Sequence, residues 1–123
     1  MAETEEDARD ALEALSPFAP IPRFSPTFTT GGAVGAVYTL AGKTEEALPW
    51  LEQETRACNG VSFPITHTRA FEWLGRAREQ KGDVEGACAA YEVVLKRWGQ
   101  AKPRSVTAEA ARERRKVLRC GAR

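Results

Sequence analysis

The sequence predicts an all-α fold in which two helix-turn-helix hairpins stack on each other. The first observation is that the chain matches itself at an offset of 40 residues. The matched pairs are Val34 and Leu74, Gly35 and Gly75, Gly42 and Gly82, Glu45 and Glu85, Ala47 and Ala87, and Leu51 and Tyr91. The second observation is that apolar residues recur at helical spacing within each copy. A repeat of fixed period indicates stacked units that share one core.

The N-terminal segment is predicted to hold a short amphipathic helix over residues 4–15. Thr4 followed by Asp7 has the form of a capping box, and apolar residues then recur at helical spacing. Residues 17–28 contain four prolines and three phenylalanines, a composition that favours extended backbone. The phenylalanines are Phe18, Phe24 and Phe28. We expect this Pro/Phe strap to pack along the helical body, and a free ligand of the P-x-x-P form is the alternative.

The first hairpin is predicted from helices over residues 31–41 and 44–58 that a glycine turn joins. Gly35 would let the first helix approach the second closely, and Ala47 would lie where the two cross. Pro49 lies early in its helix, where its missing donor removes at most one hydrogen bond. The side chains expected to face inward are Val34, Val37, Tyr38, Ala41, Ala47, Leu48, Trp50 and Leu51.

The second hairpin is predicted from a helix over residues 64–81 and a helix that runs to Trp98. Ser62 or Thr66 is expected to cap the first of these helices, and Gly82 with Asp83 makes the turn between them. The side chains expected to face inward are Ala70, Phe71, Leu74, Gly75, Ala87, Cys88, Tyr91, Val94 and Leu95. Residues 59–63 read as a loop that lengthens the period to 40 residues.

A last helix over residues 106–119 is predicted to close the stack, with Thr107 as its N-cap. Ala110, Ala111, Val117 and Leu118 would face the body, and the basic residues would face outward. A polar outer face is typical of a terminal helix in a repeat protein. The predicted organisation is an N-terminal segment, residues 1–30, followed by a repeat domain, residues 31–123.

Composition and charge limit the classes of function. With 42% hydrophobic and 28% charged residues in 123, the chain has the composition of one soluble domain, expected in the cytoplasm. No apolar run approaches the roughly 18 residues of a membrane span, and no signal peptide is recognisable. Residues 1–15 carry a net charge of −5, and residues 96–123 carry +8. The basic end could attract nucleic acid, an acidic protein surface or the chain's own acidic end, although no interleaved aromatic residues support nucleic-acid binding.

Catalytic and metal-binding motifs are not found in the sequence. His67 is the only histidine and is interpreted as a surface or helix-end residue, because no metal-ligand spacing surrounds it. Cys58, Cys88 and Cys120 form no C-x-x-C pair, so neither a disulfide framework nor a zinc site is predicted. Cys88 is interpreted as a small buried hydrophobic residue. We expect no enzyme activity, no cofactor and no metal.

The repeat pattern resembles a known family. An apolar residue and Gly, a turn Gly seven residues later and an Ala five residues after that resemble the tetratricopeptide repeat (TPR). The resemblance implies a right-handed stack in which residues 31–58 and 64–98 are two repeats and residues 106–119 are a capping helix. The sequence of residues 66–69, 74–75, 81–91 and 97–107 resembles the C-terminal TPR tails of certain multidomain bacterial serine/threonine protein kinases, which implies a non-catalytic regulatory or docking region.

The TPR resemblance also implies a site, because the first helix of each repeat lines a concave groove that receives a peptide. Carried onto the second repeat, the groove positions are Arg69, Glu72, Arg76, Glu79 and Gln80. The first repeat offers the small or neutral residues Gly32, Ala36, Thr39 and Leu40. The Lys/Asn set that holds a C-terminal carboxylate in some TPR proteins is missing. The alternative is that the charged residues only pair with one another on a solvated face.

Three functional hypotheses follow. The first is a protein-protein interaction or scaffolding module, monomeric or weakly self-associating, that binds a protein or peptide partner in the groove. The second is a structural or autoinhibitory tail of a bacterial kinase system in which the Pro/Phe strap fills the groove. The third is electrostatic docking through the basic C-terminal helix.

Overall fold

A computed structural model describes residues 2–21, 31–58 and 60–122, and within them it is all-helical. The α-helices of these residues are α1 (Glu5–Leu15), α2 (Gly31–Leu40), α3 (Thr44–Arg56), α4 (Pro64–Lys81), α5 (Val84–Trp98) and α6 (Val106–Val117). A short 3-10 helix, Ser16–Phe18, follows α1. The described residues contain no strand, which confirms the predicted all-α class.

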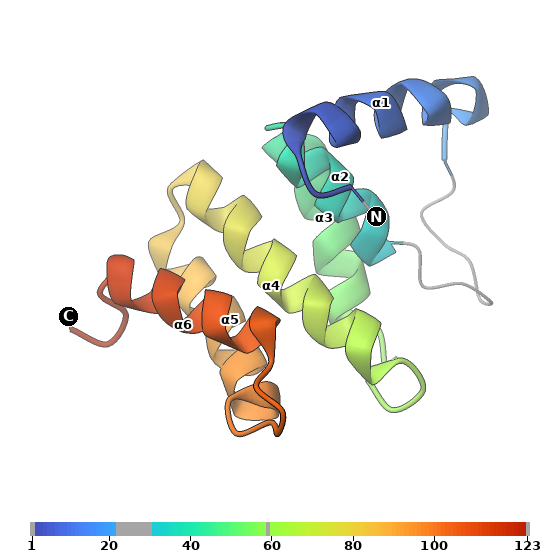
Figure 1. The fold of residues 1–123 in the computed structure, drawn as a ribbon. Helices are drawn as coiled ribbons and strands as arrows, with labels where there is room; N and C mark the ends of the chain where they lie inside the picture. Colours follow the sequence, from blue (N-terminus) through green and yellow to red (C-terminus); the bar gives the residue numbers. More distant parts are fainter. Residues whose placement is uncertain (1, 22–30, 59, 123) are drawn as a thin grey trace.

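The helices pack as two hairpins with one extra helix at each end (Figure 1). Helix α2 pairs with α3, and α4 pairs with α5. Helix α4 also contacts α2, α3 and α6, so it lies at the centre of the molecule (Figure 1). Helix α6 packs on α5 and α4, whereas α1 packs on α2 and on no other α-helix of the described residues.

The offset of 40 residues recurs in the turns of the two hairpins. The amide of Lys43 donates to the carbonyl of Tyr38 at 2.8 Å, and the amide of Asp83 donates to the carbonyl of Arg78 at 2.9 Å. The turn glycine lies in the left-handed region in both hairpins, with φ of 72° in the first and 82° in the second. Only glycine adopts that conformation without strain, so the predicted glycine turns are confirmed.

The paired helices touch where the sequence places a glycine. A Cβ atom on Gly35 would lie 2.5 Å from Cγ of Leu51, and a Cβ on Gly75 would lie 2.5 Å from Cε1 of Tyr91. Real Cβ atoms do not approach other atoms so closely, so each glycine is required by the helix contact. The pairs Gly35 with Leu51 and Gly75 with Tyr91 are themselves related by the offset of 40 residues.

The core consists of two clusters of largely small side chains. The first, between the hairpins, is formed by Ala47, Leu48, Leu51, Leu74, Ala77 and Ala90. The second, under α6, is formed by Ala87, Tyr91, Val94, Ala108 and Ala111. Phe71 is only partly buried, but it packs against both clusters and so joins them.

The inward face predicted for α2 is partly wrong. Val34, Val37 and Tyr38 are half-buried, whereas the buried residues of this helix are Gly32, Gly35, Ala36 and Thr39. Helix α2 is covered by α1, α3 and α4 on different sides. Gly32 lies against Ala70 of α4 and Gly35 lies against Leu51 of α3, so the small residues occupy the closest helix contacts.

Several predicted helix ends also differ from the structure. Thr4 and Asp7 form the predicted capping box of α1. In contrast, Ser105 and not Thr107 caps α6, and α4 begins after Phe63 without a side-chain cap. Helix α3 ends at Arg56, before the predicted Cys58, and α2 ends at Leu40, before the predicted Ala41. Each difference is one or two positions, which is the usual uncertainty of a helix end.

The Pro/Phe strap is only partly among the described residues. Phe18 belongs to the short 3-10 helix and is 72% exposed, so the predicted packing on the helical body is wrong at this residue. Phe24 and Phe28 lie outside the described residues.

The prediction that the chain forms no disulfide is wrong. Cys88 of α5 and Cys120, just after α6, are joined across a Cα distance of 5.7 Å and a sequence separation of 32 residues. Cys58 is free and exposed. Structural disulfides are typical of oxidising compartments, so the cytoplasmic location stays a prediction. In the part of the chain that is described, no helix has the length and apolar character that crossing a membrane requires.

Candidate functional site

A narrow apolar slot lies between α2 and α4. It has a volume of about 80 Å³. Its lining consists of Gly32, Ala33, Ala36, Ile65, Thr66, Arg69, Ala70 and Trp73. Three of the predicted groove residues, Gly32, Ala36 and Arg69, therefore meet here from the two hairpins. The slot can take one small aliphatic side chain, because its walls are alanine, glycine and hydrocarbon, and Arg69 brings a positive charge to it.

A wider hollow of about 540 Å³ lies on the other side of α4, against α6. Its lining consists of Arg76, Glu79, Gln80, Ala110, Glu113 and Arg114. The slot and this hollow flank the same helix, so α2, α4 and α6 together form one candidate binding face. We call this surface the α4 face.

Glu72 and Arg76 form an ion pair on α4 in which only the cation is accessible. The Arg76 Nε atom lies 2.6 Å from Glu72 Oε1, and the side chains are 41% and 7% exposed, respectively. The Arg76 guanidinium also lies over the ring of Trp73, 4.5 Å from its centroid. Burial raises the pKa of Glu72 above its ordinary value, although Arg76 and Arg69 act in the opposite direction.

Glu79 joins α4 to two other helices. Its Oε1 atom accepts hydrogen bonds from the hydroxyl of Tyr91 at 2.6 Å and from Nε of Arg114 at 3.0 Å. Burial by itself would raise the pKa of Glu79, but the bonds from Arg114 and Tyr91 outweigh it and lower the pKa. The predicted pairing among α4 residues on a solvated face is therefore wrong for Glu79, whose partners lie on α5 and α6.

Gln80 and Thr39 link the two hairpins. The Gln80 side-chain amide donates to the carbonyl of Thr39 at 3.0 Å, and the Thr44 hydroxyl donates to Gln80 Oε1 at 2.6 Å. Thr39 is 1% exposed and its hydroxyl donates to the carbonyl of Gly35. Thr39 is thus engaged in the fold, and Gln80 holds it while also lining the hollow beside α6. Arg69 and Ala36 line the slot, and Arg76 lines the hollow.

The sequence reasoning missed several residues of the α4 face. Trp73 lies four residues after Arg69 and three before Arg76, so helical spacing alone could have placed it on the same face. Arg114 carried no such signal, because it is 35 residues away from Glu79 in the chain. Only the packing of α6 against α4 brings Arg114 to the site.

His67 lies in the first turn of α4, so the predicted helix-end position is confirmed, but it is buried and does not lie at the surface. It is 5% exposed. Its Nδ1 atom lies 2.8 Å from an Arg97 guanidinium nitrogen, and its Nε2 atom lies 3.1 Å from the carbonyl of Ala57. Because Arg97 can only donate, Nδ1 accepts and Nε2 carries the proton that it donates to Ala57. His67 therefore fastens the α3–α4 loop to α5, and no group of three metal-ligating side chains occurs among the described residues.

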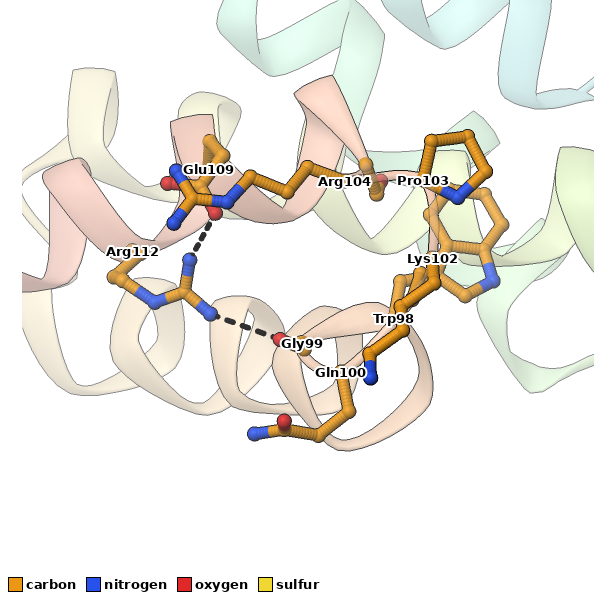
Figure 2. A pocket seen from close by; sticks show the side chains of 10 residues that line it. Trp98, Gly99, Gln100, Lys102, Pro103, Arg104, Glu109 and Arg112 are labelled. Atoms are coloured by element: carbon orange, nitrogen blue, oxygen red, sulfur yellow. Dashed lines mark hydrogen bonds and ion pairs between the residues drawn. The ribbon is translucent and has the colours of Figure 1, made fainter.

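A second hollow, of about 660 Å³, lies at the loop between α5 and α6 (Figure 2). Arg112 closes one side of it, because its guanidinium pairs with Glu109 and donates to the carbonyl of Gly99. Lys102 and Arg104 have no ion-pair partner within the described part of the chain. Figure 2 shows Arg104 extending along α6 toward Glu109, whereas Lys102 lies on the other side of the hollow. The two cations therefore do not converge on one point.

Comparison with known proteins finds no matching family model, no matching curated protein and no matching solved structure.

Proposed function

We propose that this chain is a non-catalytic protein interaction module with a TPR-like arrangement, which binds a peptide segment of a partner protein on the α4 face. The observation that carries the proposal is the apolar slot between the hairpins, with Arg69 in its lining. Such a combination of one apolar anchor position and a nearby cation is typical of peptide recognition. The recurrence of the turn and helix contacts at an offset of 40 residues supports the TPR-like arrangement.

The size of the slot limits the affinity that it can supply. Burial of one aliphatic side chain contributes about 1.5 to 3 kcal/mol, and a micromolar complex requires about 8 kcal/mol. A peptide therefore needs further contacts along α4 and α6. This estimate favours an extended partner segment of several residues over a single small molecule.

The resemblance to kinase tails supports a regulatory setting for this module, in the cytoplasm. In that setting the chain docks a partner and leaves catalysis to another domain or protein. Self-occupation of the groove by the Pro/Phe strap stays a hypothesis, because residues 22–30 lie outside the described part of the chain.

Peptide display tests the proposal. A library of random displayed peptides is panned against the parent chain and against Ala33→Trp, which places a bulky ring at the mouth of the slot from an exposed position. Ala89→Trp, at an exposed position of α5, is the matched control. We expect peptides that bind the parent and the control with equal affinity and bind Ala33→Trp at least tenfold more weakly. Selected peptides that bind all three chains equally would contradict the proposal.

A second candidate is electrostatic docking of an acidic partner at the α5–α6 hollow, and the cations Lys102 and Arg104 favour it. Exposed charges of this kind are screened by salt over about 10 Å at 0.1 M. Partner binding that disappears in Lys102→Glu/Arg104→Glu and at high salt, yet persists in Ala33→Trp, would favour this candidate over the groove.

A further inference from the structure

Helix α1 carries a row of carboxylates without a cationic partner. Glu6, Asp10 and Glu13 are spaced by four and three residues, so they share one side of the helix, and we call them the acidic stripe. All three are exposed, whereas Ala8, on the opposite side of α1, is buried. Within the described residues, none of the three carboxylates takes part in an ion pair.

The helix against which α1 packs does not neutralise the stripe. The α-helical neighbour of α1 in the described residues is α2, which contains no charged residue. The 3-10 helix Ser16–Phe18 that follows α1 is also uncharged. Within α1 the cation is Arg9, beside the stripe, so five acids and one arginine leave the helix a net charge of −4.

An exposed aromatic residue follows the acidic stripe. Phe18 ends the 3-10 helix directly after α1 and is largely exposed. Aromatic residues are enriched at protein interfaces, because contact with a partner removes their large apolar surface from water. The N-terminal segment therefore presents carboxylates and one aromatic side chain together.

The α5–α6 hollow offers the complementary chemistry. The charged residues that line it are Lys102, Arg104, Glu109 and Arg112. Arg112 pairs with Glu109, so Lys102 and Arg104 leave the lining a net charge of +2. Trp98 and Pro103 add apolar surface to the same lining, and the volume of about 660 Å³ has room for an aromatic ring.

The placement of the cations favours a row of carboxylates over a single one. Figure 2 shows Arg104 extending along α6 and Lys102 on the other side of the hollow. A ligand with one charged group cannot reach both cations at once. The acidic stripe extends over seven residues of helix, about 10 Å at 1.5 Å per residue, so different carboxylates can face different cations.

These two surfaces do not meet within one chain. Helix α1 has no contact with α5 or α6 in the described residues. Figure 1 shows α1 at one end of the molecule and the loop between α5 and α6 at the other. The hollow of one copy is therefore available to the acidic stripe of another.

We propose that copies of this chain associate head to tail, with the acidic stripe of one copy across the α5–α6 hollow of the next. Phe18 enters the hollow against Trp98 and Pro103. The contact joins two different surfaces, so association continues beyond a dimer. This inference rests on the second candidate function, because it identifies the acidic partner of the hollow, and it does not involve the apolar slot.

Sedimentation equilibrium tests the association directly. All chains carry Cys58→Ser, which prevents dimers linked through the exposed thiol. At about 20 mM NaCl we expect the average mass to exceed the 13.5 kDa of one chain and to rise with concentration. At about 500 mM NaCl the mass should return to that of one chain, because salt screens exposed charges.

Two variants identify the surfaces. Glu6→Gln/Asp10→Asn/Glu13→Gln neutralises the stripe, and Lys102→Gln/Arg104→Gln neutralises the hollow. We expect each to associate at least tenfold more weakly by itself. A mixture of the two should form a dimer that grows no further, because the first variant keeps an intact hollow and the second keeps an intact stripe.

Matched controls change the charge elsewhere. Glu45→Gln/Glu46→Gln/Glu85→Gln removes three exposed acids, and Lys43→Gln/Arg56→Gln removes two exposed cations. Both controls should associate like the parent, whereas Phe18→Ala should weaken association at least threefold. Thermal melting verifies that each variant is folded.

A parent chain that keeps the mass of one chain at low salt overturns the inference. So does association that both variants retain, or that Phe18→Ala leaves unchanged. A fluorescein-labelled poly-Glu peptide distinguishes this failure from failure of the second candidate function. If the peptide binds the parent tenfold more tightly than it binds Lys102→Gln/Arg104→Gln, and the parent does not self-associate, the hollow takes an acidic partner other than this chain.

Discussion

At the scale of single residues, position within the helix contact decides what a residue does. Gly32 and Gly35 lie on the same helix, three residues apart, and both are buried. A Cβ atom on Gly32 would have ordinary contacts, the nearest at 3.5 Å from Cβ of Ala70, whereas one on Gly35 would collide with Leu51. One glycine is therefore required by the fold and the other is not.

This contrast predicts opposite effects of the same substitution. Gly32→Ala should raise the free energy of unfolding by up to about 1 kcal/mol, because alanine is the better helix former and its Cβ would make ordinary contacts. Gly35→Ala should lower it by about 1 to 3 kcal/mol through overpacking against Leu51. Urea denaturation of both variants measures the difference. Equal changes in stability would contradict the helix contact.

The ion pair of Glu72 and Arg76 predicts a second asymmetry. Arg76→Met leaves a buried carboxylate without its partner and should cost about 1 to 3 kcal/mol. Glu72→Gln removes the buried charge and leaves a mostly accessible arginine, so it should cost less. The two variants are compared by chemical denaturation at neutral pH. A larger loss of stability in Glu72→Gln than in Arg76→Met would contradict the view that the buried carboxylate depends on Arg76.

Glu79 predicts a dependence of stability on pH. Its pKa is lowered in the folded chain, chiefly because the bonds from Arg114 and Tyr91 outweigh burial. The ionised form therefore stabilises the fold above the ordinary pKa of glutamate, and this contribution is lost as the pH falls through the lowered value. Glu79→Gln should be less stable than the parent at neutral pH, and the difference should shrink as the pH falls below the ordinary pKa of glutamate and through the lowered pKa of Glu79. A difference that does not change with pH would contradict this assignment.

At the scale of elements, α6 buries only small side chains against the rest of the molecule. Its buried residues are Ala108 and Ala111, which have little apolar surface. The disulfide from Cys88 to Cys120 and the ion pair of Arg114 with Glu79 fasten it to α5 and α4. Helix α6 forms one wall of the α4 face, so its attachment also determines the shape of the candidate site.

Removal of the disulfide should therefore weaken α6 more than the rest of the molecule. Cys120→Ser should lower the free energy of unfolding by about 2 to 4 kcal/mol under oxidising conditions. A thiol reagent should label only Cys58 in the folded, oxidised chain and all three cysteines after reduction and unfolding. The control Cys58→Ser should leave stability within about 0.5 kcal/mol of the parent. Three reactive thiols in the oxidised, unfolded chain would contradict the disulfide.

At the scale of the whole molecule, consecutive helices of each hairpin pack on each other and α4 contacts helices of both hairpins. Helix α4 contacts α2, α3, α5 and α6, whereas α1 contacts α2 as its only α-helical neighbour in the described residues. The net charge also changes along the chain, from −5 in residues 1–15 to +8 in residues 96–123. Figure 1 shows α1 and α6 at opposite ends, so the two charged segments do not neutralise each other within one chain.

This arrangement predicts a gradient of local stability. In a stack, an end helix can open without its neighbours, and central helices open only when most of the molecule unfolds. Amide hydrogen exchange should be fastest in α1 and slowest in α4 and α5. Uniform protection of all helices would show instead that the molecule opens as a single cooperative unit.

The sequence by itself determined the elements and their local ends to within a few residues. Periodic apolar residues, the turn glycines Gly42 and Gly82 and the Thr4 capping box depend on interactions within a few positions, which the sequence displays directly. The helical class and the close contacts at Gly35 and Gly75 follow from the same local pattern repeated at an offset of 40 residues. The groove positions Arg69, Arg76 and Ala36 were implied by the TPR resemblance, and their role in binding stays a prediction.

Only the tertiary structure decided the features that join distant segments. The Cys88–Cys120 disulfide, the burial of His67 against Arg97 and the bond from Arg114 to Glu79 connect residues 32, 30 and 35 positions apart, respectively. Sequence spacing carries no signal for such contacts, because they depend on how α6 and the α3–α4 loop pack on α5 and α4. The same packing buries Glu72 and Glu79 and exposes their arginines, so the charge of the candidate site could not be predicted from the alternating signs of α4 alone.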